Sequence, residues 1–123
     1  MATLLVVDDE PSVLKLIAYV LCSEHYVITA ESGIEALAIF ESYPDQIDLI
    51  VTDVTMPGMS GLELVARLEA LHKRRFAVLF ITGASEYPID ACRAVLPKPF
   101  TPIGLKDAAR QLLQAFRSCR ERQ

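Results

Sequence analysis

Short apolar runs that end abruptly at polar residues alternate with amphipathic stretches along this chain, and this alternation limits its fold more than any other feature. Because the runs are largely apolar and not alternately polar, we expect strands that are covered on both faces, as in a parallel sheet. The predicted strands are Leu4–Val7, Tyr26–Ala30, Asp48–Thr52, Ala77–Ile81 and a short fifth run that begins near Ala94 and is closed by Leu96-Pro97-Lys98-Pro99.

The stretches between the runs carry apolar residues at helical spacing and have recognisable first turns. Pro11 occupies the tolerated first position of one helix, and Thr101-Pro102 form an N-cap and first-turn pair for the last. Ser32 and Glu35 have capping-box spacing, so the Glu35 carboxylate is expected to reach back to Ser32. A further helix is marked by Leu62, Val65, Leu68 and Leu71. Alternating strands and helices predict a doubly wound α/β fold with helices on both faces.

The connection before the last strand departs from this pattern. If that strand starts near Ala94, only residues 83–93 form the crossover, close to the minimum of about 10–12 residues for a βαβ connection. Pro88 lies in the middle and biases Tyr87 away from helix. We therefore expect a fourth helix that is shortened to about a turn or replaced by a mobile loop.

Composition narrows the class of protein further. The length of 123 residues fits one domain. The hydrophobic fraction of 52% is too high for an intrinsically disordered chain. The longest apolar run, Leu16–Cys22, falls far short of the roughly 18 residues of a membrane span. Three scattered cysteines with no CxxC pair indicate a cytoplasmic protein without a disulfide framework. All of the 12 lysines and arginines except Lys15 follow residue 66, but they are dispersed, so we expect no direct DNA binding.

Polar residues stand where the predicted strands end, and ligands of an open parallel sheet bind at this edge. Carboxylates brought together there need a cation, and Mg²⁺ is the natural choice. A hydroxyl and an ammonium group could then bind a phosphoryl group, and a carboxylate could accept it as a nucleophile. Asp53 is best placed for that role. The full set is Asp8, Asp9 and Glu10 after the first strand, Asp53 after the third, Thr82 after the fourth and Lys98 after the fifth.

In this order and at these strand ends, the residues resemble the receiver domain of bacterial two-component response regulators over nearly the whole chain. The resemblance implies strand order 2-1-3-4-5 and a single receiver domain over residues 1–123. Because the chain ends with its last predicted helix, we expect no output domain, and the chain is either a stand-alone receiver or a receiver cut from a longer protein. The motifs that carry it are Asp8-Asp9, the loop Thr52-Asp53-Val54-Thr55-Met56-Pro57-Gly58-Met59-Ser60-Gly61, the pair Thr82-Gly83 and the run Lys98-Pro99-Phe100.

The resemblance also implies a role for each site residue. Asp53 is the expected phosphoacceptor, and Mg²⁺ is expected on Asp8, Asp9, the Asp53 carboxylate and the backbone carbonyl of Thr55. The expected phosphoryl-binding and switch residues are Thr82, Gly83 and Lys98, with a cis bond before Pro99.

One position departs from the family. Receivers usually have an aromatic residue three positions before the lysine, where this chain has Val95. We therefore expect phosphorylation to be signalled by ordering of residues 83–93 and not by an aromatic switch. The implied partners are a histidine kinase or histidine phosphotransfer protein upstream and a protein target downstream.

Alternatives from other classes fit less well. A flavodoxin-like carrier would need a phosphate-binding loop where Asp8-Asp9-Glu10 would repel phosphate. A Mg²⁺-dependent phosphohydrolase with an aspartyl nucleophile would usually carry a second acid at the position of Thr55. A receiver-like module that only binds proteins is disfavoured because no site residue is missing. His25 and His72 lie away from the strand ends and are predicted to be surface residues.

Overall fold

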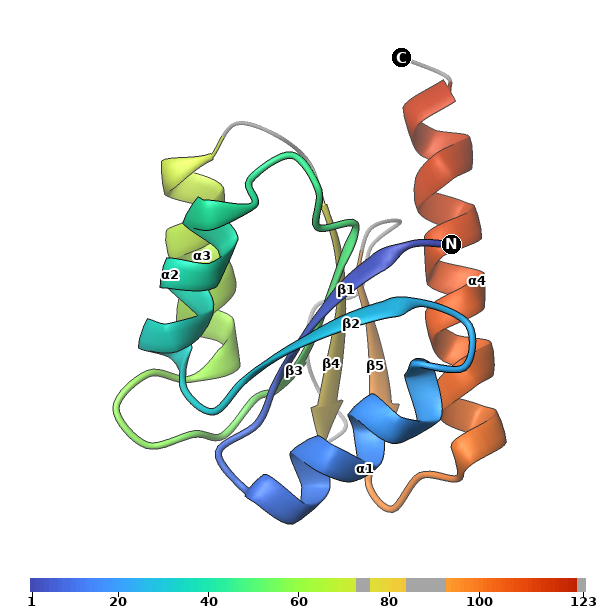
Figure 1. The fold of residues 1–123 in the computed structure, drawn as a ribbon, viewed down its shortest axis with the longest axis horizontal. Coiled ribbons are helices and arrows are strands. Elements are labelled where there is room, and N and C mark those ends of the chain that lie inside the picture. Colours follow the sequence, from blue (N-terminus) through green and yellow to red (C-terminus); the bar gives the residue numbers. More distant parts are fainter. Residues whose placement is uncertain (73–75, 84–92, 122–123) are drawn as a thin grey trace.

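The computed structural model describes residues 1–72, 76–83 and 93–121, and in it five parallel strands form one sheet (Figure 1). The strand order is β2-β1-β3-β4-β5, which confirms the predicted doubly wound topology. The observed strands begin within a residue of the predicted ones, and the first four also end within a residue of them. They are β1 (Thr3–Val7), β2 (Tyr26–Ala30), β3 (Leu49–Asp53), β4 (Ala77–Thr82) and β5 (Arg93–Pro97).

The described helices cover both faces of this sheet (Figure 1). On one face lie α1 (Pro11–Leu21) and α4 (Pro102–Glu121), and on the other lie α2 (Gly33–Ser42) and α3 (Gly61–Leu71). Because side chains alternate along a strand, β1 supplies Leu4 and Val6 to the core under α1 and α4. Its residues Leu5 and Val7 enter the opposite core, under α2 and α3. The central strands are therefore buried on both sides, as their largely apolar sequences predict.

The start of α2 differs in one detail from its predicted capping box. The Ser32 hydroxyl accepts a hydrogen bond from the Glu35 N–H at 3.1 Å, as expected. The Glu35 carboxylate, however, accepts from the N–H of Glu31 at 3.2 Å and not from that of Ser32. This hydrogen bond links the first turn of α2 to Glu31, the residue that directly follows β2.

The predicted shortening of the fourth helix concerns residues 84–92, which lie outside the described part of the chain. The proposed ordering of residues 83–93 therefore stays a prediction. Val95 lies on β5 opposite Phe80 and packs against the core under α2 and α3. None of the helices in the described ranges has both the length and the apolar character needed to cross a membrane.

Candidate functional site

The strand register brings the predicted site residues to one edge of the sheet. Asp53, the last residue of β3, lies opposite Ile81 on β4. The next residue of β4, Thr82, pairs with Pro97 on β5, and the Lys98 N–H donates to the Thr82 carbonyl at 2.9 Å. Since all strands run in the same direction, the carboxylate, hydroxyl and ammonium groups gather at their carboxyl ends.

Three carboxylates form the acidic part of this site. Oxygen atoms of Asp8, Asp9 and Asp53 all lie within 4.8 Å of one another. Asp8 is only 1% exposed and Asp53 9%, whereas Asp9 is exposed. One Asp8 oxygen accepts from the Glu10 N–H at 2.9 Å. The other, Oδ2, is buried and has no hydrogen-bond partner among the described residues.

The surroundings of the Asp8 carboxyl group disfavour its charged form. Burial raises the pKa of the Asp8 carboxyl above its ordinary value, and the nearby Asp53 carboxylate raises it further. A buried charged oxygen is stabilised when a hydrogen-bond donor or a cation faces it. Three converging carboxylates with one unpartnered oxygen suit a hard divalent cation such as Mg²⁺, which prefers oxygen ligands. The expected metal ligands Asp8, Asp9 and Asp53 therefore fit such an ion, while ligation by the Thr55 carbonyl stays a prediction.

The Asp53 carboxylate is held from two directions. Lys98 Nζ lies 3.2 Å from Asp53 Oδ2, and the Lys98 side chain is 34% exposed. The Thr55 N–H donates to Asp53 Oδ1 at 3.3 Å. The bond between Lys98 and Pro99 is cis, as predicted. This arrangement places a positive charge on the same carboxylate that the acidic cluster approaches.

The predicted hydroxyl is also at this edge. Thr82 is 4% exposed and is followed by the exposed Gly83, at which an added Cβ would meet no atom within 4 Å. The roles of Thr82 and Gly83 in phosphoryl binding stay predictions.

Sequence reasoning missed the role of Gly61 in shaping the site. A Cβ placed on Gly61 would lie 2.3 Å from the carbonyl oxygen of Asp53, and the Gly61 N–H donates to the Val54 carbonyl at 2.8 Å. The loop after Asp53 therefore returns so closely that a side chain has no space. Only the clustering of turn residues in this loop could have signalled such an approach.

Sequence reasoning also missed a largely apolar hollow beside the lysine. It has a volume of about 450 Å³ and connects the start of α1 with the segment after β5. Its lining residues are Glu10, Val13, Leu16, Lys98, Pro99 and Phe100. Lys98 links this hollow to the acidic site, because its side chain lines the hollow and its Nζ lies 3.2 Å from Asp53 Oδ2.

These features define a doubly wound α/β protein with an acidic, lysine-paired site at the carboxyl edge of its sheet. Residues 4–110 match the family model for the response regulator receiver domain, which identifies the family within this broad class. The chain belongs to this family, whose members act in two-component signalling. No feature favours the phosphohydrolase alternative, since Thr55 carries no carboxylate.

The sequences of related proteins align with most of this chain. It is 35% identical to the sensor kinase CckA of Brucella abortus over 92% of its own length but spans only 13% of that protein. It is 34% identical to a chemotaxis protein CheY homolog of Campylobacter jejuni, covering 89% of this chain and 91% of the relative. The chain spans less than half of several other curated relatives, including 48% of the transcriptional regulatory protein PhoP of Bacillus subtilis.

Solved structures give the same result for the fold. The receiver domain of the hybrid histidine kinase CckA matches with a TM-score of 0.79 and 33% identity, covering 92% of this chain and 100% of that one. The chemotaxis protein CheY4 of Vibrio cholerae matches with a TM-score of 0.77 and 30% identity, covering 91% and 98%. The five-stranded order and its helices are therefore those of receiver domains.

Replacing Asp8 by asparagine is expected to stabilise the metal-free protein by about 1–2 kcal/mol, because it removes a buried charge whose Oδ2 has no hydrogen-bond partner among the described residues. The Asp8 pKa is raised, so the wild type should gain stability relative to Asp8→Asn as pH falls from neutral through that pKa toward 3.8. Urea unfolding in chelator at several pH values measures both effects.

Asp9→Asn is the matched control for this prediction. Asp9 is exposed, so its change should weaken Mg²⁺ binding while altering metal-free stability by less than the Asp8 change does. Equal stability shifts in the two variants would contradict the burial argument. Unchanged Mg²⁺ affinity in both would contradict a shared acidic site.

Proposed function

We propose that Asp53 accepts a phosphoryl group from a histidine kinase or a histidine phosphotransfer protein, with Mg²⁺ bound by Asp8, Asp9, Asp53 and the Thr55 carbonyl. The observation that carries the proposal is the position of the Asp53 carboxylate between Lys98 Nζ and the unpartnered, buried side of Asp8. A carboxylate is a competent nucleophile toward phosphorus when surrounding cations screen its charge. The Lys98 ammonium group is one such cation, and the acidic cluster offers ligands for Mg²⁺ as the other.

Each chain residue contributes a distinct part of the reaction. An Asp53 carboxylate oxygen attacks phosphorus, the bond from phosphorus to the donor nitrogen breaks, and an acyl phosphate forms on Asp53. The Lys98 ammonium group offsets the charge that the phosphoryl oxygens bring, and the Thr82 hydroxyl donates a hydrogen bond to one of them. When bound, Mg²⁺ supplies further charge neutralisation at the phosphoryl oxygens.

The proposal limits the catalytic activity of the chain to reactions of its own phosphoryl group. It acts as a signalling phosphoprotein that catalyses only its own phosphorylation and its slow dephosphorylation, and it passes the signal to a protein target. We place this exchange in the cytoplasm, in keeping with three scattered cysteines that suggest no disulfide framework.

Phosphoryl uptake from acetyl phosphate tests the proposal without any knowledge of the natural donor. Intact-mass spectrometry should show one added phosphoryl group in Mg²⁺ and almost none in excess chelator. Equal uptake with and without Mg²⁺ would contradict the assignment of the acidic cluster as a metal site.

The apolar hollow beside Lys98 offers a place for the donor protein. A phosphohistidine must come within bonding distance of Asp53, so its protein must cover the edge where Lys98 lies. Leu16 is 50% exposed and lines the hollow with Val13 and Phe100, which gives the donor an apolar contact next to the reacting groups. We infer that the donor protein docks on this hollow.

Leu16→Glu is expected to slow transfer from a histidine-phosphorylated donor by about tenfold or more, because it puts a charge into the apolar contact. Uptake from acetyl phosphate should remain at the wild-type rate, since the small donor needs no docking surface. Leu71→Glu is the matched control, because Leu71 is 60% exposed at the far end of α3. Equal slowing by both leucine changes would show that the hollow is not the docking site.

A further inference from the structure

The outer edge of β2 presents backbone groups that no described strand pairs. β2 lies at the end of the sheet and has β1 as its one neighbour within the described residues. The Tyr26 N–H donates to the Ala2 carbonyl, and the Ala30 carbonyl accepts from the Asp8 N–H. In a parallel ladder the residues alternate, so both backbone groups of Val27 and of Thr29 point away from the sheet.

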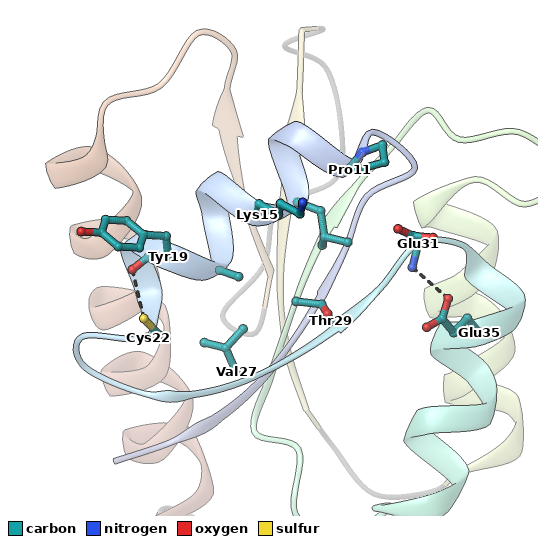
Figure 2. Close-up of a pocket in the computed structure, with 10 residues that line it drawn as sticks. Pro11, Lys15, Tyr19, Cys22, Val27, Thr29, Glu31 and Glu35 are labelled. Carbon is teal, nitrogen blue, oxygen red and sulfur yellow. Dashed lines mark hydrogen bonds between the residues drawn. The ribbon is translucent and has the colours of Figure 1, made fainter.

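A groove runs beside this edge on the α1 side of the sheet. Its volume is about 510 Å³, and its lining includes Leu14 and Ala18 of α1 and Val27 and Thr29 of β2. Figure 2 shows the side chains of Val27 and Thr29 directed toward α1, with Tyr19 and Cys22 at one end of the groove. Val27 and Thr29 thus carry outward backbone groups that no described strand pairs, and their side chains form part of the floor of the neighbouring groove.

The other end of the groove is acidic. Glu31 and Glu35 line it, and the hydrogen bond from the Glu31 N–H holds the Glu35 carboxylate in place (Figure 2). Within the described ranges, neither carboxylate lies in an ion pair, and the one basic residue of the lining, Lys15, is exposed on α1 without an acidic partner. The groove therefore carries two carboxylates against one ammonium group.

We propose that the groove and the outer edge of β2 together bind an extended segment of a partner protein that carries a basic residue. The segment would pair with Val27 and Thr29 as an added strand, and every second side chain would enter the groove above Ala18. Its basic residue would meet Glu31 and Glu35. This binding is separate from the phosphoryl chemistry at Asp53 and does not depend on it.

A second copy of this chain is a poorer occupant than such a segment. Residues 24–32, which contain β2 and its flanks, include the acids Glu24 and Glu31 and no lysine or arginine. A pair of β2 edges would therefore leave the acidic end of each groove without a cation. A partner strand with a basic residue satisfies both the backbone groups and the charge.

Amide hydrogen exchange with a defined peptide tests the proposal. The probe is the capped heptapeptide Arg-Thr-Val-Thr-Val-Thr-Arg, whose two arginines allow either strand direction, and its counterpart has glutamate in place of both. In the free protein the N–H groups of Val27 and Thr29 should exchange faster than that of Ile28, which faces β1. The basic peptide should slow exchange at Val27 and Thr29, and it should bind about tenfold more tightly than the acidic one.

Two variants separate the edge from the charge. Thr29→Pro removes an outward N–H without removing a bond to β1, so it should weaken peptide binding by about tenfold while Thr29→Ala does not. The double change Glu31→Gln and Glu35→Gln should remove the preference for the basic peptide. Protection of the Ile28 N–H reports that each variant is folded.

Three results would overturn the proposal. The first is unchanged exchange at Val27 and Thr29 at about 1 mM basic peptide, where even weak specific binding would be visible. The second is equal affinity for the basic and acidic peptides. The third is peptide binding by Thr29→Pro that equals binding by Thr29→Ala, which would indicate a pocket without strand pairing.

Discussion

Replacing Asp53 by asparagine is expected to abolish Mg²⁺-dependent phosphoryl uptake from acetyl phosphate. The amide has nearly the shape of the carboxylate but is a far weaker nucleophile, and its loss of charge removes both the pairing with Lys98 and one third of the acidic cluster. We expect uptake to fall by at least about a hundredfold, the scale of losing an essential catalytic group. Intact-mass spectrometry of the variant in Mg²⁺ and acetyl phosphate measures the effect.

Asp45→Asn is the matched control for this change. Asp45 is an exposed acid outside the site, so its replacement alters the net charge of the chain equally without touching the cluster. It should leave uptake at the wild-type level. Substantial phosphorylation of Asp53→Asn would mean that another group accepts the phosphoryl group and that the site assignment is wrong.

Gly61→Ala is expected to destabilise the protein by about 2–3 kcal/mol, the upper range for forcing an atom into a packed region. The added Cβ would meet the Asp53 carbonyl at 2.3 Å, a contact with backbone that no side-chain rotation relieves. Relief requires the loop to move away from β3, which would also displace Asp53. Urea unfolding should therefore show lower stability, and uptake from acetyl phosphate should fall in the fraction that remains folded.

Gly83→Ala separates this steric effect from the general cost of changing a glycine. Among the described residues, an added Cβ at Gly83 meets no atom within 4 Å, so the stability of Gly83→Ala should differ from that of the wild type by less than about 0.5 kcal/mol, as at ordinary surface positions. Equal destabilisation by the two changes would show that the close approach of Gly61 to Asp53 is not what makes the position sensitive.

The fold could be predicted largely because strand burial is so complete. The central strands are apolar except at their carboxyl ends, and the structure buries every residue of β3 and β4. Helix faces were harder to predict. Leu62 and Leu71 share a spacing of three with Val65 and Leu68, yet both are exposed. A helix turns every 3.6 residues, so a strict spacing of three drifts off the buried face.

The gathering of Asp8, Asp9, Asp53 and Lys98 at one edge could also be predicted, because strand ends meet at one edge wherever a parallel sheet forms. The difference between Asp8 and Asp9 could not, since adjacent acids look alike in sequence and only the sheet decides which one is buried. The histidine prediction was wrong for a similar reason. His72 is half-buried, and its ring centroid lies 4.9 Å from that of Phe40, a contact between distant segments that local patterns do not reveal.

Direct chemical localisation of the phosphoryl group tests the central claim. Borohydride reduces an aspartyl phosphate to homoserine, so tandem mass spectrometry of the treated, proteolysed chain identifies the residue that carried it. After reaction with acetyl phosphate in Mg²⁺, the account predicts homoserine at position 53 and unmodified aspartate at Asp8 and Asp9. Homoserine at either of those acids, with Asp53 unmodified, would contradict it.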